Sequence, residues 1–462
     1  MNPHPDLARR HFVRLSAAGF ATLGLSPFGR LLAQAGLPAG RIEGFGPLAP
    51  VADETTGLPL LMLPKGFSYR SFGWVSTPMS DGRATPSNHD GMGVVHADGS
   101  RLILVRNHEC PGVGGTFADA SMTYDPDVDG GTTTLVFDAD KGELLASRAS
   151  LSGTLRNCAG GITPWNSWLS SEEAVLNPGR AVLDERVVDI KHAHGFVFEV
   201  PFNGPSRAEP LVAMGQRVHE AAVVHAASGD VYMTEDADPV AGFYRFVPKV
   251  KGELQRGGTL WMLKAEGAAD LRKGHQAGAR FKVRWVPVVH PEQGIGPSGR
   301  TDGNLQQGLA EGGSRFIRLE GCYVEGDIVY FTSTNGGDAG CGQVWAYDAK
   351  ASELLLVFES PAQETLYYPD NLAMSPRGGL VLCQDSYRKE AQSLFGLTPQ
   401  AGLFEFARNN GQYDNFHGLN GDYTSSEFAG ACFSPDGRWL FVNVYNPGFT
   451  VAITGPWQQG LL

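Results

Sequence analysis

A strand–turn–strand pattern that recurs along the chain limits the possible folds more than any other feature. In each copy a turn with glycine leads into an alternating apolar run, which ends at a polar residue; one copy has its turn at 435–438, its run at 440–442 and its end at Asn443. Related turns lie at 97–100, 227–230, 325–327 and 376–379. Proline presets φ in such turns and glycine takes the left-handed position, so these units are typical of β-hairpins.

A short motif of one polar residue followed by small residues stands upstream of each turn. A further copy at 157–161 lacks the glycine turn. The polar residues of the copies are Asp90, Cys158, Glu220, Glu320, Asp370 and Glu427. Six such units predict an all-β, six-bladed β-propeller with loop and short helical insertions, in which residues 36–462 form a single catalytic domain.

The first strand of each propeller blade lines the central channel, so we expect these six polar residues to converge there. Acids at the ends of the second strands are expected to form a nearby ring: Glu109, Glu172, Glu235 and Asp385. So many carboxylates repel one another in a confined space, and metal cations are a simple way to keep them ionised. The alternative, that they are solvated turn residues, does not explain why they recur in phase.

Charge and motif content exclude several classes of function. With 37 Lys and Arg against 49 Asp and Glu, the net charge of −12 lacks the basic footprint of a nucleic-acid-binding protein. The six cysteines form no Cys-x-x-Cys pair, which argues against a tetrathiolate zinc site, and Cys322 and Cys341 remain candidates for a disulfide. The chain has neither a serine-hydrolase elbow near a suitable histidine nor a P-loop.

The N-terminus has the features of an export signal. Arg9 and Arg10 precede a weakly apolar stretch at 15–25, and a small-x-small cleavage pattern ends at Ala35. This pattern predicts a twin-arginine signal peptide over residues 1–35, with the twin-arginine (Tat) translocase as a partner during export and a periplasmic or secreted mature protein. The alternative is a basic amphipathic helix. After Ala35 no apolar stretch approaches the ~18 residues of a membrane span.

From about Pro64 to Pro447, the motifs resemble those of the PhoX-type alkaline phosphatases. The shared motifs lie at 106–109, 130–134, 156–165, 171–173, 219–221, 244–246, 369–372 and 433–437. The Cys-Ala-Gly-Gly-x-Thr-Pro-Trp run within 158–165 is long and specific. This resemblance implies a six-bladed propeller that hydrolyses small-molecule phosphate monoesters at a cluster of Fe³⁺ and Ca²⁺.

The resemblance also implies roles for individual residues. Cys158 matches a thiolate ligand of iron, and Arg318 matches the arginine that binds phosphate. Glu220, Glu320 and Asp370 match acids of the family's motifs, and Asp385 lies where the family has an acid. The predicted catalytic residues are therefore Arg318, Cys158 and Glu320. Arg315 competes with Arg318 for the phosphate, and Leu319 and Gly321 depart from the family pattern, so that one calcium site differs.

Two other functions fit the sequence. Propellers with axial calcium also hydrolyse lactones or related esters, which would require one or two calcium ions and no thiolate. A propeller that binds a ligand or partner without catalysis would bind calcium and turn over no phosphate ester. In each case we expect a monomer.

Overall fold

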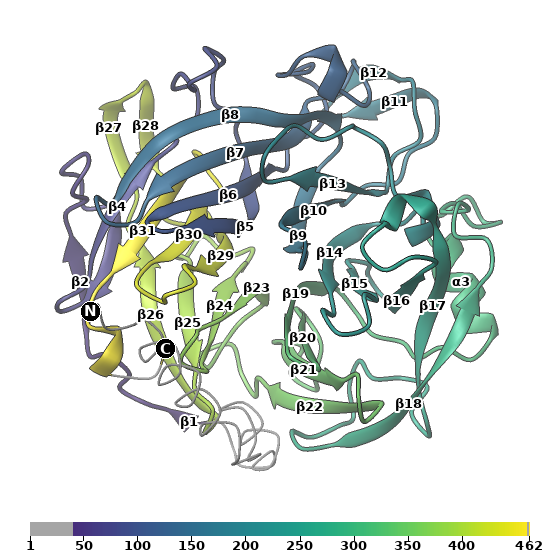
Figure 1. Cartoon of the computed structure of the whole chain (residues 1–462). Coiled ribbons are helices and arrows are strands. Elements are labelled where there is room, and N and C mark those ends of the chain that lie inside the picture. The colour runs from purple at the N-terminus through teal and green to yellow at the C-terminus, as the bar shows by residue number, and fades with distance from the viewer. Residues whose placement is uncertain (1–39, 460–461) are drawn as a thin grey trace, which may run out of the picture.

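The computed structural model describes residues 40–459 and residue 462, and these are mostly β-strand. The predicted signal peptide at 1–35 lies outside the described residues. The sheets are arranged around a common centre, and successive strands of a sheet, such as β5 to β8, lie farther and farther from it (Figure 1). The all-β class predicted from the sequence is therefore confirmed.

The innermost strands form a closed ring. Each of them contacts the next, and the last contacts the first. In chain order they are β5 (His89–Asp98), β9 (Asn157–Ile162), β14 (His219–Val224), β19 (Leu319–Glu325), β23 (Pro369–Met374) and β29 (Phe428–Phe433). These strands carry or directly follow the polar-then-small motifs, so the motif residues from distant parts of the chain meet at the centre.

The small residues of the motifs let the inner strands approach closely. A Cβ added to Gly91 would lie 2.6 Å from the Cα of Ala159 on the next inner strand. A Cβ added to Gly321 would lie 2.6 Å from the backbone nitrogen of Leu372. Neither position has room for a side chain, which explains why glycine follows the acid there.

Behind each inner strand the chain continues outward in antiparallel order. β5 is followed by β6 (Arg101–His108), β7 (Gly130–Asp138) and β8 (Glu143–Thr154), and β9 by β10 (Ser167–Glu172) and β13 (Val197–Pro201). β14 is followed by β15 (Val231–Glu235), β16 (Phe243–Pro248), β17 (Gly258–Ala265) and β18 (Arg280–Val288). β19 is followed by β20 (Ile328–Ser333), β21 (Gln343–Asp348) and β22 (Glu353–Glu359).

Pairing of β18 with β22 joins the last two groups into one nine-stranded sheet. This sheet curls so far that its two end strands, β14 and β19, contact each other. The next sheet contains β23, β24 (Leu380–Gln384), β25 (Ser393–Leu397) and β26 (Gly402–Asn409), and β26 also pairs with β1 (Gly40–Arg41) and β3 (Leu61–Pro64), the latter next to β2 (Leu48–Val51).

The last sheet joins the two ends of the described chain. It contains β29, β30 (Leu440–Val444), β31 (Phe449–Thr454) and the early strand β4 (Ser68–Phe72), which pairs with β31 (Figure 1). The rings of Phe67 and Trp457 meet edge to face at 4.7 Å next to this pairing. Because β4 comes from the beginning of the described chain, the ring of sheets is closed by hydrogen bonds rather than by a loop.

Insertions extend from these sheets as two hairpins and short helices. The hairpins are β11 (Gly179–Leu183) with β12 (Arg186–Ile190), and β27 (Gln412–Phe416) with β28 (Leu419–Asp422). The helices of the described residues are α3 (Gly303–Ala310) and the 3-10 turns η1 (Ala120–Met122), η2 (Val212–Met214), η3 (Leu254–Arg256) and η4 (Trp457–Gln459). Within residues 40–459, no helix is long and apolar enough to cross a membrane.

The candidate disulfide between Cys322 and Cys341 is not formed, since all six cysteines are free. Cys322 packs into an apolar cluster on β19. The thiol of Cys341 lies in the loop before β21, where it donates to the carbonyl of Ala339 at 3.3 Å. The two side chains therefore have separate surroundings, and this candidate pairing is not observed.

Candidate functional site

A β-bulge interrupts the pairing of every inner strand with the strand behind it. In five of the pairs, two motif residues lie opposite one partner; Asp90 and Gly91, for example, fall in the register shift between His89 and Met92. The same shift occurs at Cys158–Ala159, Glu220–Ala221, Glu320–Gly321 and Asp370–Asn371, and in β29 it comes after Ala429. A bulge bends a strand and changes the direction of a side chain. The same local distortion therefore recurs with each copy of the motif.

Side chains from the second strands fix the backbone of the motif residues in the neighbouring unit. The hydroxyl of Thr234 donates to the carbonyl of Glu320 at 2.7 Å, and that of Thr332 donates to the carbonyl of Asp370 at 2.6 Å. The amide of Asn107 donates to the carbonyl of Cys158 at 2.7 Å, and the amide of Asn443 donates to that of Asp90. Each motif residue named here is thus held by a hydrogen bond from the neighbouring unit, which orients it with little freedom.

Five of the six motif residues, all but Glu220, line a cavity of about 280 Å³ together with residues that follow the second strands. Of the residues predicted from the sequence, it is lined by Asp90, Glu109, Cys158, Arg318, Glu320, Asp370, Asp385 and Glu427. The structure adds residues that the sequence reasoning missed: Arg156, Glu173, Asp236 and Tyr387. Eight acidic side chains and only two arginines line this wall, so the protein concentrates acidic groups there.

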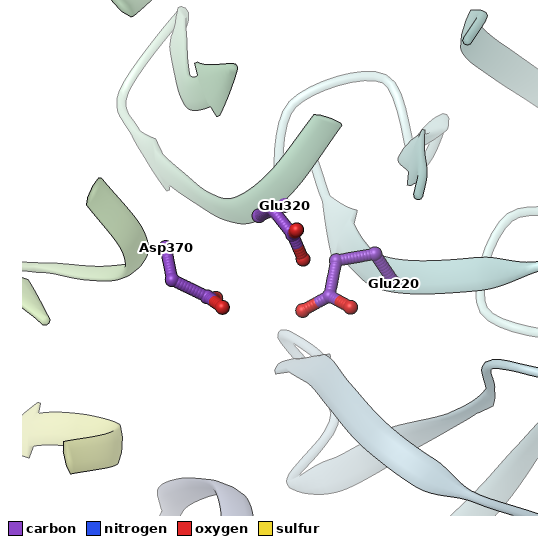
Figure 2. A group of neighbouring side chains, drawn as sticks. All are labelled: Glu220, Glu320 and Asp370. Atoms are coloured by element: carbon purple, nitrogen blue, oxygen red, sulfur yellow. The ribbon is translucent and has the colours of Figure 1, made fainter. Parts of the chain in front are cut away.

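Two groups of carboxylates lie close enough together to hold metal ions. Oxygen atoms of Glu220, Glu320 and Asp370 lie within 4.8 Å of one another, and Figure 2 shows the three side chains pointing toward a common space. A second group contains Asp370, Asp385 and Glu427. Because Asp370 belongs to both, the two groups form one continuous cluster.

Glu220 has the least ordinary environment of these acids. Its side chain is 0% exposed, and neither carboxylate oxygen accepts a hydrogen bond. Burial, followed by the nearby Glu320 and Asp370, raises its pKa well above the usual range. A buried carboxylate without any donor is costly unless a cation neutralises it, so this donor set fits a metal.

Burial and the neighbouring acids also raise the pKa values of the other acids in the cluster. Burial, followed by the neighbouring acids, raises the pKa values of Asp90, Glu320 and Glu427 well above their usual range. Burial and Asp385 raise the pKa of Asp370 to about 8, in spite of an opposing effect of Arg318. These acids ionise together at neutral pH only if positive charge is added to the cavity.

Cys158 lies within this acidic wall. Its Sγ is 3.7 Å from the Oδ2 of Asp90. Burial, and then Asp90 and Glu220, raise the pKa of the thiol well above the usual range. The protein alone therefore keeps Cys158 protonated, and a bound cation would be needed to make it a thiolate.

Arg318 is the cation most closely integrated with the cluster. One terminal nitrogen, Nη2, donates to Glu320 at 2.5 Å, and its Nε donates to Asp236 at 3.1 Å. Its other terminal nitrogen, Nη1, is buried without a hydrogen-bond partner. The rival candidate Arg315 does not line the cavity, and its backbone pairs with Ala269 and Asp270.

The structure does not bring Glu172 to the cavity. Glu172 is the last residue of β10. Its carboxylate does not line the cavity and instead accepts hydrogen bonds from His194 and from backbone N–H groups. The next residue, Glu173, lines the cavity instead.

Glu235 shows the same displacement by one residue. It ends β15 and accepts bonds from Gly242 N–H at 2.8 Å and from the Tyr244 hydroxyl at 2.9 Å, whereas Asp236 lines the cavity. Glu109 and Asp385, which line the cavity, also directly follow their strands, β6 and β24. The common position is thus the first residue beyond the second strand, and the adjacent acids in 172–173 and 235–236 were the signal for it.

Taken together, the cluster offers carboxylate ligands for hard cations, one thiol, and an arginine with a free donor at its edge. Such a set can bind metal ions and an anionic group at the same time. Cations held there could act as Lewis acids in a hydrolysis.

Comparison with curated proteins gives no match, and two solved structures match this chain only distantly. Among solved structures, hydrazine synthase from Kuenenia stuttgartiensis matches with 11% identity over 81% of this chain and 97% of its own, at a TM-score of 0.33. The pyrroloquinoline quinone domain of pyranose dehydrogenase from Coprinopsis cinerea matches with 11% identity over 85% and 97%, at a TM-score of 0.29.

The family profile described as alkaline phosphatase PhoX matches residues 43–150 and 141–448, which is most of the chain. The match includes every residue of the acidic cavity described above. The chain therefore belongs to the PhoX alkaline phosphatase family.

Proposed function

We propose that the protein is a metal-dependent phosphomonoesterase that acts on small phosphate esters in the acidic cavity. Family membership supports a hydrolase of the alkaline phosphatase type that depends on metal ions. The single observation that carries the proposal is the buried carboxylate of Glu220, whose oxygens lack donors and face Glu320 and Asp370. Cations between these acids would let them stay ionised without hydrogen-bond donors, which supports metal binding.

The two groups of carboxylate side chains would hold the ions. Glu220, Glu320 and Asp370 are the proposed ligands of one group, and Asp370, Asp385 and Glu427 those of the other. Asp90, Glu109, Cys158, Glu173 and Asp236 line the same cavity and would complete the cluster. We propose Ca²⁺ for the all-oxygen sites and Fe³⁺ beside Cys158, because the softer thiolate suits iron. When bound, these ions supply Lewis acidity and an activated water-derived nucleophile.

Arg318 would bind the phosphoryl group through its free Nη1. Asp236 and Glu320 hold the rest of the guanidinium, so its direction is set before substrate arrives. This pre-orientation lowers the entropy lost on binding. Glu320 would thus act twice, as a metal ligand and as the group that positions Arg318.

The sequence features outside the cavity fit an exported enzyme. We propose that the closed ring of inner strands heads six blades of a propeller, that residues 36–462 form one catalytic domain, and that this domain is a monomer. Residues 1–35 would direct it through the twin-arginine translocase to the periplasm or the medium. The family is generally exported, which supports this location.

The test is hydrolysis of 4-nitrophenyl phosphate by protein loaded with iron and calcium, before and after treatment with a calcium chelator. We expect turnover that the chelator removes and added calcium restores. Glu320→Gln should abolish it, while Glu325→Gln, at the other end of the same strand, should not. Turnover of lactones but not of phosphate esters, with calcium and no iron bound, would support the lactonase instead. Bound calcium with no turnover of either ester would support a non-catalytic propeller.

A further inference from the structure

An exposed aromatic ring stands at the edge of the acidic cavity. Tyr387 lines the cavity, two residues beyond the proposed ligand Asp385, and yet 72% of its surface is exposed. Large aromatic side chains are usually mostly buried, so an open ring beside a binding cavity requires an explanation.

Neighbouring rings hold Tyr387 in place. Tyr368 meets it edge to face, with 5.9 Å between the centroids and 80° between the planes. Tyr368 in turn stacks on Tyr367 at 4.0 Å, and the guanidinium of Arg388 lies 4.9 Å from the Tyr367 ring. The exposed ring is therefore backed by an ordered row of aromatic groups, which lowers the cost of using it as a contact surface.

Tyr387 also lies beside the proposed phosphate contact. The Cζ of Arg318 is 5.4 Å from the centre of the Tyr387 ring, and the buried Nη1 of Arg318 has no partner. A phosphoryl group bound there would place its ester oxygen, and the group beyond it, within reach of the ring. The rest of the cavity wall is mainly carboxylate, which offers little to an uncharged leaving group.

We propose that Tyr387 is a specificity-determining residue that stacks on the leaving group of the substrate, so that aryl phosphates and nucleoside monophosphates are preferred over alkyl phosphates. This inference rests on the proposed function, because it takes the phosphoryl group to be bound at Arg318 and the metal cluster. Stacking of one aromatic group on another contributes about tenfold to an equilibrium constant. An alkyl phosphate such as glycerol 2-phosphate has no flat face and would not gain this factor.

Two non-hydrolysable ligands test the inference without depending on turnover. The dissociation constants of phenylphosphonate and methylphosphonate are measured by calorimetry on the metal-loaded full chain. We expect the wild type to bind the phenyl compound about tenfold more tightly, and Tyr387→Leu to bind the two equally. Tyr387→Phe keeps the ring and should keep the preference. Tyr423→Leu, which changes a tyrosine that does not line the cavity, should also keep it.

The kinetic counterpart compares phenyl phosphate with glycerol 2-phosphate. The ratio of their kcat/KM values should fall about tenfold in Tyr387→Leu, mainly through the KM of phenyl phosphate. The role of Tyr387 is overturned if the wild type binds the two phosphonates equally, or if Tyr387→Leu keeps the preference for the phenyl compound. The proposed function still stands in either case if the protein hydrolyses 4-nitrophenyl phosphate. Failure to bind either phosphonate, together with no hydrolysis of 4-nitrophenyl phosphate, overturns both proposals.

Discussion

Replacing Glu172 by glutamine should destabilise the protein strongly, although the same change at the adjacent Glu173 should not. The Oε1 of Glu172 accepts bonds from Leu155 N–H at 2.9 Å and from His194 Nδ1 at 2.6 Å. Its Oε2 accepts bonds from Gly195 N–H at 2.7 Å and from Phe196 N–H at 3.0 Å. All four donors are buried, and a glutamine NH₂ would confront two of them whichever way it turned.

The magnitude follows from breaking a buried, hydrogen-bonded charge pair, which costs about 3–5 kcal/mol of unfolding free energy. Burial alone would lower the pKa of His194, but Glu172 and Asp125 raise it to about 9. A raised histidine pKa stabilises the fold fully below the unfolded value of about 6.5, and this contribution disappears as the pH rises through about 9. The loss caused by Glu172→Gln should therefore be largest near pH 6 and smaller above pH 9.

Urea denaturation of the wild type, Glu172→Gln and Glu173→Gln at pH 6 and pH 9.5, without added metal, measures these differences. Burial, followed by Glu109, raises the pKa of Glu173 well above its usual range. Its ionisation thus opposes folding of the metal-free protein, and Glu173→Gln should leave stability unchanged or increased. A loss below 1 kcal/mol in Glu172→Gln, or an equal loss in both variants, would refute this assignment of the two neighbours.

Three further predictions test other parts of the account. Arg318→Lys should raise the KM for phosphate esters about tenfold, because lysine lacks the fork that lets one nitrogen reach phosphate while the others bind Asp236 and Glu320; an unchanged KM would assign the phosphate to another residue. Gly321→Ala should lower the unfolding free energy by about 1–3 kcal/mol in a urea titration, since its Cβ would overlap the backbone of β23, whereas Gly204→Ala, with open space around it, should change little. Removing calcium with a chelator should lower the thermal midpoint by several degrees, restored by calcium, because the carboxylates then repel one another; an unchanged midpoint would argue against a structural metal cluster.

Much of the arrangement was visible in the sequence because the repeats keep their phase. A polar residue before the small residues recurs once per unit, and the structure brings Asp90, Glu320 and Asp370 to one cavity as expected. Their exact aim could not be predicted, since it depends on a bulge in each inner strand. A bulge inserts one residue and shifts which side chains face the centre, and alternation alone does not reveal it.

The errors have the same physical origin. Whether Glu172 or Glu173 faces the cavity depends on the residue at which β10 ends, and strand ends are poorly defined by apolar patterning. Asp236 was missed for this reason as well. Tyr387 carried no signal in the sequence, because an aromatic residue in a loop predicts neither exposure nor a place beside Arg318.

The central claim is that the buried acids of the inner strands hold metal ions. Elemental analysis of protein exported from its native host, with Glu220→Gln as the comparison, tests it most directly. The account predicts bound iron and calcium in the wild type and a loss of bound metal in Glu220→Gln, whose folded state should persist because a neutral amide replaces an unpaired buried carboxylate. Wild-type protein that contains neither metal yet hydrolyses phosphate esters would contradict the account.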